Sequence, residues 1–391
     1  MQLINSGRRV LAIVSVVFAA LLGGGAGALL GTCGPFTDTA NDAFCGFILE
    51  VYYLGITTGT TPTTYDPGSN VTRTQMAAFL SRTVDRVLQR SRRAALDQFW
   101  TPQNATVLRL TTVGSGPELV RSDGADLWVA NNGGGGSVSR VRGSDGKLLE
   151  TWTGAGSAAG VLVAMGGVFV AGTTSPGNLY EIDPTQAAGA VTTVASNLGN
   201  GPFGIAFDGT RIWTASLSGG SVSIVTPGAT IPWTVTTVTT GFSGPFGALY
   251  DGANVWVTDN TAGTLLKLDG SGAILQTVSV GTFPRIPIFD GTNIWAPNGG
   301  SASFSVVRAS SGAVLATLTG NGLNAPSTAA FDGQRILVTN QIGNSVSLWK
   351  AADLTTLGSF ATGVSTFPFG ACSDGVNFWI ALNGTNKLAR F

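Results

Sequence analysis

Most of the chain, residues 104–391, is built from short stretches in which apolar and polar residues alternate. One unit reads "FGIAFD", "RIWTAS", "SVSIVT" and "TVTTVTTG" in chain order, and each stretch has the period of two that indicates a β-strand. The first two stretches are joined by Asp-Gly, a strong hairpin signal because glycine tolerates positive φ and aspartate often does. Each unit therefore predicts a four-stranded antiparallel sheet.

The unit recurs seven times along the chain. Its hairpin centres lie at Asp123, Met165, Asp208, Asp251, Asp290, Asp332 and Asp374, which are 42, 43, 43, 39, 42 and 42 residues apart. A sustained period near 42 predicts a β-propeller. The last unit ends after its third strand, and a stray fourth strand, residues 105–114, precedes the first unit. We therefore expect a mainly β protein with a seven-bladed propeller over residues 104–391, closed by pairing of 105–114 with 385–391.

Residues 33–93 follow a different pattern, with apolar residues at helical spacing. Met76, Ala77, Leu80, Val84 and Val87 predict a helix. Its start is marked by a capping box, in which a threonine at position 72 is followed three residues later by glutamine. We expect a small α-helical module here, joined to the propeller by a linker over residues 94–103.

The first 28 residues have the order of a secretory signal peptide. Arg8 and Arg9 precede an apolar run over residues 10–22, and small residues follow at 26–28. The run is about 13 residues long, shorter than the roughly 20 that span a bilayer. We expect cleavage, no membrane span afterwards, and a secreted or cell-envelope location. An uncleaved membrane anchor is the alternative.

Export favours a disulfide between Cys33 and Cys45, since disulfides persist in oxidising compartments. Two free thiols are the alternative. Cys372 lies far away in the sequence and is interpreted as a small buried apolar residue.

Composition narrows the chemistry. The 21 basic and 21 acidic residues balance, so nothing predicts a nucleic-acid partner. The chain has no histidine, which excludes a Ser/His/Asp triad, a Cys/His dyad and a His-ligated zinc site. We expect neither a metal nor another cofactor.

The helical module resembles the S-layer homology (SLH) family. The matching pieces are Phe36 and Asp38, Leu54-Gly55-Ile56 with Gly59, Tyr65-Asp66-Pro67, Val71-Thr72-Arg73, Met76-Ala77 and Leu80. In that family the arginine at the helix start grips an anionic cell-wall polysaccharide, so the resemblance implies this role for Arg73. Gln75 replaces the usual glutamate, and one module stands where three are usual. A dimerisation role therefore stays open.

The propeller resembles the family of streptogramin lyase, NHL and YncE-like propellers through its repeated "P-x-G-I-A-F-D-G…I-W-V-T" phrase. The lyase uses a histidine base and a magnesium-binding glutamate. Because this chain lacks histidine, the resemblance implies the fold and does not carry over the base.

Topology places the candidate binding residues. The first strand of each unit starts, and the second ends, on one side of the ring, and the Asp-Gly turns lie on the other. The expected ligand-binding side carries Glu118, Asn131, Asn132, Phe203, Phe246, Asp259, Asn260, Arg285, Asn298, Asn340, Phe369 and Asn383. Turn geometry and channel plugging are the alternative explanation. The recurring tryptophans and Asp-Gly aspartates are interpreted as structural.

Two function classes follow. The first is an exported, envelope-associated binding or scaffold protein whose partner is a cell-wall polysaccharide or a surface protein. The alternative is a carboxylate-dependent lyase or glycan-cleaving enzyme that uses, for example, Glu118 with Asp259.

Overall fold

The computed structural model describes residues 35–39, 44–53, 56–80, 82–83 and 109–391. The chain divides into two compact units, residues 1–101 and 102–391, and each is described by itself. The predicted signal peptide, the whole predicted linker over residues 94–103 and Cys33 lie outside the described residues. Within the described part, no helix is both long and apolar enough to cross a membrane.

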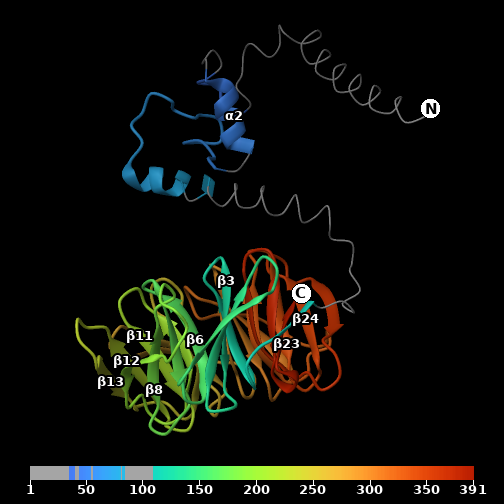
Figure 1. Cartoon of the computed structure of the whole chain (residues 1–391). Helices are drawn as coiled ribbons and strands as arrows, with labels where there is room; N and C mark the ends of the chain where they lie inside the picture. Colours follow the sequence, from blue (N-terminus) through green and yellow to red (C-terminus); the bar gives the residue numbers. More distant parts are fainter. Residues whose placement is uncertain (1–34, 40–43, 54–55, 81, 84–108) are drawn as a thin grey trace, which may run out of the picture. The chain divides into compact units, whose positions relative to one another are not determined.

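The first unit contains α2 (Cys45–Tyr53) and a second helix over residues 73–80 that continues at 82–83. Phe36 is fully buried and contacts the ring of Tyr52 edge-on at 5.2 Å and that of Tyr65 at 5.5 Å. Ile48, which belongs to the helix labelled α2 in Figure 1, completes this small core. The second helix starts as predicted, with Thr72 and Gln75 exchanging hydrogen bonds in a capping box.

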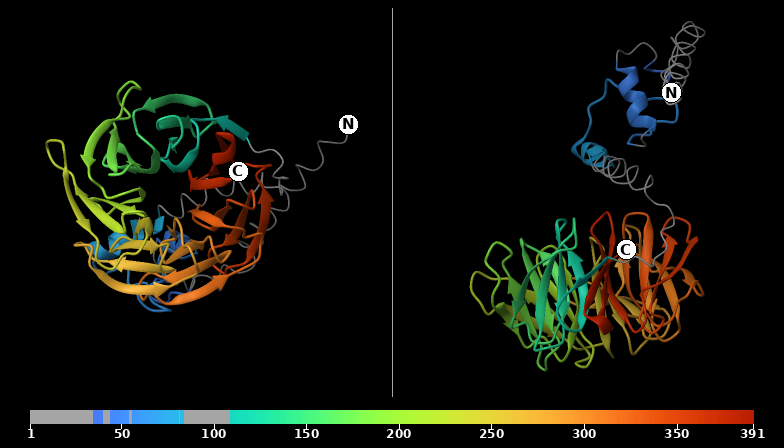
Figure 2. Two further views of the ribbon diagram at one scale, coloured as in Figure 1. Left: turned by 90° about the horizontal axis from the view of Figure 1, so that it is seen from below. Right: turned by 45° about the vertical axis from the view of Figure 1, so that its right-hand side comes forward.

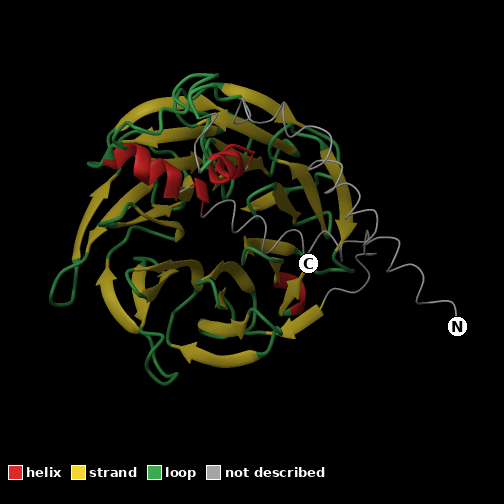
Figure 3. Ribbon diagram, turned by 90° about the horizontal axis from the view of Figure 1, so that it is seen from above, coloured by secondary structure: helices red, strands yellow, loops and turns green. Residues whose placement is uncertain are grey.

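The second unit is a ring of seven four-stranded antiparallel sheets, which confirms the predicted seven-bladed propeller (Figures 2 and 3). Blades 1 and 2 contain β2 (Pro117–Ser122), β3 (Asp126–Asn131), β4 (Ser137–Arg142), β5 (Leu148–Thr153), and β6 (Ala158–Ala164), β7 (Gly167–Gly172), β8 (Asn178–Ile182), β9 (Thr192–Ser196). Blades 3 and 4 contain β10 (Pro202–Phe207), β11 (Ile212–Ser216), β12 (Ser221–Thr226), β13 (Thr234–Val238), and β14 (Pro245–Tyr250), β15 (Val255–Asp259), β16 (Thr264–Leu268), β17 (Ile274–Ser279).

Blades 5 and 6 contain β18 (Ile288–Phe289), β19 (Asn293–Asn298), β20 (Ser303–Arg308), β21 (Val314–Leu318), and β22 (Pro326–Phe331), β23 (Arg335–Asn340), β24 (Ser345–Lys350), β25 (Thr356–Ala361). Blade 7 contains β26 (Pro368–Ser373), β27 (Phe378–Leu382), the short 3₁₀ helix η2 (Asn383–Thr385), β28 (Lys387–Arg390) and β1 (Arg109–Thr112).

Blade 7 joins the two ends of this unit. Its outermost strand, β1, pairs antiparallel with β28, with Arg109 opposite Arg390 and Thr112 opposite Lys387. Residues 105–108, the start of the strand expected at this edge, lie outside the described residues. The pairing covers a strand edge that would otherwise stay open.

The Asp-Gly hairpins are fastened by a side-chain hydrogen bond. In blade 3 the Asp208 carboxylate accepts the backbone N–H groups of Thr210 and Arg211 and the indole N–H of Trp213. The same aspartate–indole bond, 2.7–2.8 Å long, recurs in the other blades with this tryptophan, at Asp123–Trp128, Asp251–Trp256, Asp290–Trp295 and Asp374–Trp379. These tryptophans are fully buried, so they have the structural role expected of them.

Candidate functional site

One position recurs at the start of the innermost segment of each blade. It is the residue that follows the first residue of the blade's innermost segment, namely Glu118, Ala159, Phe203, Phe246, Arg285, Ser327 and Phe369 in blades 1 to 7. In the six blades other than blade 5, a register shift between the first and second strands marks a β-bulge here. In blade 3, Pro202 pairs with Ser216 and Gly204 with Ala215, which leaves Phe203 outside the ladder. Bulges re-aim a side chain, and this one releases it from the sheet.

Three phenylalanines meet across the axis. The rings of Phe203 and Phe246, in neighbouring blades, stack at 4.6 Å. Phe203 also contacts Phe369 edge-on at 5.5 Å. Blades 3 and 7 are not neighbours in the ring, so this contact is made across its centre. The three rings, one from each "PFG" triplet, therefore pack against one another near the axis, an arrangement that agrees with the channel-plugging alternative for these residues.

Each of these phenylalanines is followed by a glycine, which is needed for a steric reason. A Cβ added to Gly247 would lie 2.6 Å from the carbonyl oxygen of Arg285 in the next blade. Gly204 approaches the carbonyl oxygen of Phe246 in the same way, and Gly370 that of Glu118. Adjacent inner strands thus come too close for a side chain, and only glycine fits.

Glu118 and Arg285 are the two charged groups at the axis. Burial raises the pKa of Glu118 to about 7, although the positive charge of Arg285 opposes this shift. The Nδ2 of Asn383 lies 3.4 Å from its Oε1 and also donates to the carbonyl oxygen of Pro117. A carboxyl group with this pKa can take up or release a proton near neutral pH.

Arg285 is held by neutral partners. Its Nη1 donates to Gln341 Oε1 at 2.7 Å and to Ser327 Oγ at 3.2 Å. The guanidinium carbon lies 6.0 Å from the centroid of the Phe369 ring. Burial lowers the pKa of Arg285, while the charge of Glu118 opposes that shift. The side chain is therefore fixed in place and keeps an electrostatic interaction with Glu118.

Several predicted site residues are buried, and their side chains make hydrogen bonds inside the propeller. Asn131, Asn298 and Asn340 are fully buried, and each donates through Nδ2 to serine hydroxyls at the start of the next strand. Asp259 is also buried, and its carboxylate accepts the backbone N–H groups of Ser243, Gly244 and Ala262. These four side chains shape the loops around them and leave few polar atoms for a ligand.

The remaining predicted residues are half-buried between blades. Asn260 donates to the carbonyl oxygen of Pro284, and Asn383 to that of Pro117, each in the neighbouring blade. Asn132 follows β3 of blade 1 and is half-buried. Its backbone N–H donates to the carbonyl oxygen of Gly116, just before the first strand of that blade. The structure thus brings Glu118, Phe203, Phe246, Arg285 and Phe369 together at the axis and spreads the asparagines around them.

Sequence reasoning missed Ser327 and Gln341, the two partners of Arg285. Ser327 could have been found, because it occupies the repeat position that holds Phe203 and Glu118 in other blades. Gln341 carries no such signal, since its contact with Arg285 spans two blades.

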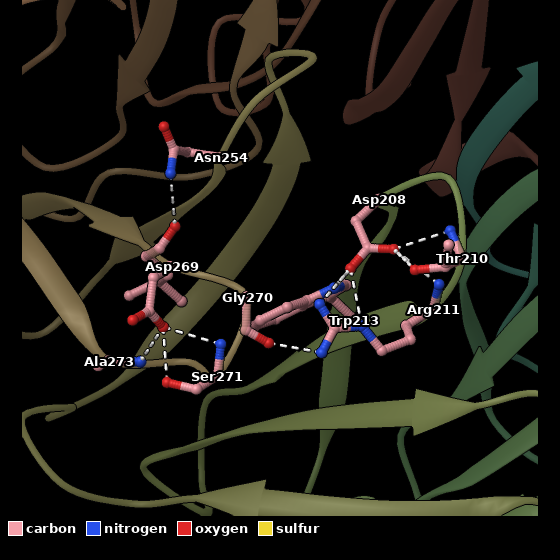
Figure 4. Close-up of polar contacts among 10 residues, drawn as sticks. Asp208, Thr210, Arg211, Trp213, Asn254, Asp269, Gly270, Ser271 and Ala273 are labelled. Carbon is pink, nitrogen blue, oxygen red and sulfur yellow. Dashed lines mark hydrogen bonds and ion pairs between the residues drawn. The ribbon is translucent and has the colours of Figure 1, made fainter.

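A second feature lies on the Asp-Gly side, where a cavity of about 160 Å³ opens between blades 3 and 4 (Figure 4). Arg211 crosses it, since its guanidinium pairs with Asp208 at 2.8 Å, lies over the Trp213 ring and donates to the carbonyl oxygen of Gly270. The same cation-to-carbonyl link to the next blade recurs at Arg140 to Pro184, Lys267 to Ala309 and Arg390 to Ser144. The polar groups of this cavity therefore clamp adjacent blades together.

In the first unit, Arg73 is the first residue of the second helix and is exposed. The capping box just before it sets the direction in which the helix leaves the loop. The carboxylate of Asp38 accepts the backbone N–H groups of Tyr65 and Asp66, which ties the preceding loop to the start of the module. Hydrogen bonding to Tyr65, opposed by slight desolvation, lowers the pKa of Asp38.

The cysteines are partly described. Cys45 is disulfide-bonded, and Cys372 is free and buried. Burial raises the pKa of the Cys372 thiol to about 12, which makes it unreactive. Because Cys33 lies outside the described residues, its pairing with Cys45 stays a prediction. Among the described residues, no three histidine, cysteine, aspartate or glutamate side chains gather in a way that could hold a metal ion.

Comparison with known proteins supports both halves of this description. Residues 35–77 match the S-layer homology domain. No curated protein matches the chain. Among solved structures, virginiamycin B lyase from Staphylococcus aureus is 16% identical, with a TM-score of 0.61 over 73% of this chain and 98% of that one.

Two further solved structures show how widely this fold is shared. A streptogramin B lyase is 16% identical, with a TM-score of 0.58 over 72% of this chain and 97% of that one. Hydrazine synthase from Kuenenia stuttgartiensis is also 16% identical, with a TM-score of 0.60 over 71% and 95%. At such identities the likeness extends to the fold alone. The chain therefore carries an S-layer homology domain, which indicates a cell-surface or envelope-associated protein, followed by a seven-bladed β-propeller similar in fold to streptogramin B lyase.

Proposed function

We propose that this protein is exported and attached to the cell envelope, where its propeller serves as a recognition platform. The S-layer homology domain binds a cell-wall polysaccharide or a surface partner, and the propeller presents the side on which the first strand of each blade starts. The observation that carries the proposal is the match of residues 35–77, with Arg73 exposed at a capped helix start. The signal-like first 28 residues agree with export.

Arg73 suits an anionic polymer for two reasons. Its planar guanidinium can bind a carboxylate or phosphate through two parallel hydrogen bonds. It also stands in the first turn of a helix, where backbone N–H groups are unpaired and the helix dipole favours negative charge. The capping box satisfies two of the donors and fixes the start of the helix, so the position of Arg73 is defined.

The propeller suits a platform because its face is rigid. The three phenylalanines at the axis and the buried asparagines tie the loops of one side to the sheets beneath them. Loops on a rigid scaffold commonly carry binding residues, because the scaffold pays no ordering entropy when a partner binds. Glu118 and Arg285 mark the centre of this side.

Sedimentation with purified cell-wall polymer tests the attachment. Full-length protein and its Arg73→Ala and Arg73→Lys variants are mixed with the polymer, and the bound fraction is measured. We expect Arg73→Ala to bind at least about tenfold more weakly, and Arg73→Lys to recover part of the loss. Arg142→Ala removes an exposed arginine from the propeller and serves as the control. Equal binding by Arg73→Ala and the parent protein would contradict the proposed attachment.

Glu118 favours a second candidate function, a carboxylate-dependent lyase or glycan-cleaving enzyme. A carboxyl group with a pKa of about 7 is matched to proton transfer at neutral pH. Asp259, the partner considered from the sequence, is committed to backbone hydrogen bonds, so Glu118 would act without it. The test is release of reducing ends or unsaturated products from cell-wall polysaccharide. Turnover abolished by Glu118→Gln supports the enzyme, and no turnover by the parent protein refutes it.

A further inference from the structure

The two sides of the propeller differ sharply in charge. We call the loops that precede the first strand or follow the second strand of each blade the entry side. Over residues 109–391, which the structure describes without a gap, the entry-side loops contain one charged residue, Arg285. The loops of the opposite side contain Asp123, Asp145, Lys147, Asp183, Asp208, Arg211, Asp251, Asp269, Asp290, Asp332, Asp353 and Asp374. The entry side is instead rich in asparagine, serine, threonine and glycine.

Three consecutive blades expose an apolar side chain on the entry side. Phe283 in blade 5 is 54% exposed, Ile342 in blade 6 is 64% exposed and Phe367 in blade 7 is 42% exposed. Val364, in the loop that enters blade 7, is 92% exposed. In blades 1, 3 and 4 the position of the two phenylalanines is held by glycine. We call these four residues the entry-side patch.

The two phenylalanines of the patch occupy strained backbone positions. Phe283 and Phe367 each precede a proline and have φ angles of 52° and 43°, in the left-handed region. Gly116 and Gly201 take the same position in blades 1 and 3, with φ angles of 61° and 67°, and avoid the steric conflict. Ser157 and Ala325 hold the same position in blades 2 and 6, with φ angles of 51° and 50°, so the left-handed backbone belongs to the repeat and does not require phenylalanine.

Each phenylalanine ring also rests on a glycine. The Cδ2 atom of Phe283 occupies the space that a Cβ on Gly300 would need, and Cδ2 of Phe367 does so at Gly384. Gly300 and Gly384 are equivalent residues of the loops after the second strand. The glycines leave room for each ring to lie on the loop backbone while about half of it stays exposed.

We propose that the entry-side patch binds a neutral polysaccharide made of pyranose sugars, an inference that rests on the recognition role proposed for the propeller. The axial C–H groups of a pyranose ring form an apolar face with slight positive charge, which fits the negative face of an aromatic ring. The surrounding amides and hydroxyls can bond the sugar hydroxyls. Spacing over three blades suits an extended polymer.

The charge distribution favours a neutral polysaccharide over other possible ligands of the entry-side patch. A polyanion would need several cations, and the single arginine on this side is already bonded to Ser327 and Gln341. Apart from Glu118 and Arg285 at the axis, the loops of this side are uncharged, and exposed aromatic rings on such loops complement an uncharged polyhydroxylated chain.

Depletion from solution by insoluble polysaccharides tests the proposal with the full chain. The probes are cellulose and chitin, which are neutral, and polygalacturonate, which is a polyanion. The variants are Phe283→Gly and Phe367→Gly, which install the residue found in blades 1 and 3. We expect each to weaken binding to a neutral polysaccharide about tenfold, and the thermal midpoint to stay equal or rise because the strain is relieved. Phe283→Trp and Phe367→Trp keep the ring and should keep the binding.

Met165→Gly is the matched control. Met165 is also exposed and has a φ of 52°, but it lies in an Asp-Gly-side hairpin, so this change relieves the same strain without touching the patch. It should leave binding to neutral polysaccharide unchanged, and so should Arg73→Ala. Salt-sensitive binding to polygalacturonate alone, no binding to cellulose or chitin, or undiminished binding by both glycine variants would each overturn the proposal. If Arg73→Ala still weakens cell-wall attachment in those cases, the proposed attachment stands and only this inference fails.

Discussion

The indole Nε1 of Trp213 donates a 2.8 Å hydrogen bond to Oδ2 of Asp208, five residues earlier in the same hairpin. This bond links the turn of the hairpin to the packed interior of the blade, because Trp213 is fully buried. Since four other blades repeat it, one local interaction sets the shape of most hairpins in the ring.

Replacement of the carboxylate in this bond should destabilise the propeller. In Asp208→Asn an NH₂ group replaces one acceptor oxygen. Either the side-chain bonds of Trp213 and Arg211 to Oδ2 or the backbone bonds of Thr210 and Arg211 to Oδ1 are therefore lost. We expect a loss of about 2 kcal/mol in the free energy of unfolding, typical of a hydrogen bond to a charged group. Chemical denaturation measures it. Asp353→Asn, at an exposed turn, is the control and should cost much less.

The Asp208→Asn effect should also depend on pH. Although partial burial opposes the shift, hydrogen bonds from Trp213, Arg211 and Thr210 lower the pKa of Asp208 to about 2 in the folded protein. A lowered pKa stabilises the fold above the unfolded-state value of about 3.9. That contribution is lost as pH falls toward 2. The difference between parent and variant should therefore shrink from pH 6 to pH 2.5, and a difference that grows would contradict this assignment.

Glu118 should have the opposite pH dependence. Burial raises its pKa to about 7, so the protonated form is favoured in the folded state. Its contribution to stability is full below the unfolded-state pKa of about 4.3 and is lost as pH rises through 7. We expect Glu118→Gln to stabilise the protein relative to the parent at pH 8 and to have little effect at pH 4, as measured by the thermal midpoint.

The control for Glu118 is a carboxylate with a close partner. Glu150 lies 3.0 Å from Arg140, so Glu150→Gln should lower stability at pH 8. A loss of stability at pH 8 in both variants would show that Glu118 is ionised and well paired in the folded protein, against the expectation.

A methyl group at the close approach between blades should not be tolerated. In Gly247→Ala the added Cβ would lie 2.6 Å from the carbonyl oxygen of Arg285 and 2.9 Å from Oγ1 of Thr258. The first neighbour is backbone and cannot move freely, so we expect a loss of about 1–3 kcal/mol in the free energy of unfolding. Gly189→Ala meets nothing closer than 3.9 Å and should be nearly neutral. Equal midpoints for the two variants would refute the steric explanation.

The capping box of the S-layer homology domain can be tested residue by residue. Thr72→Ala removes the hydroxyl that accepts the backbone N–H of Gln75 at 3.2 Å. We expect the helix over residues 73–80 to lose about 1 kcal/mol of local stability and the Gln75 amide to exchange faster with deuterium. Thr74→Ala, at an exposed position of the same helix, is the control. Unchanged exchange at Gln75 in Thr72→Ala would mean that the cap does not hold the helix start.

The repeat and the caps could be predicted because their signals are local. The Asp-Gly turns and the alternating strands recur with a nearly constant period, and seven such units have one closed arrangement that covers their edges. The capping box needs only Thr72 and Gln75, which are three residues apart. The S-layer homology match rests on ordered short pieces of sequence in the same way.

The sequence could predict which side of the ring carries the candidate site. It could not predict which side chains on that side are free to bind a ligand. Asn298 and Asp259 lie on the expected side, yet their side chains already make hydrogen bonds within their own blades. Their burial depends on how far each loop folds over its sheet. The missed partner Gln341 reaches Arg285 from another blade, a contact with no trace in the spacing of the repeat.

The amino-acid sequence by itself thus determined the number of blades, the positions of the hairpins and the helical module ahead of the propeller, since these follow from interactions within a few residues or one repeat. Only the tertiary structure decided that Phe203 meets Phe369 at the axis and that the pKa of Glu118 rises to about 7. The physical reason is ring closure. It brings blades distant in sequence around one axis, and the burial created there sets ring contacts and proton affinity together.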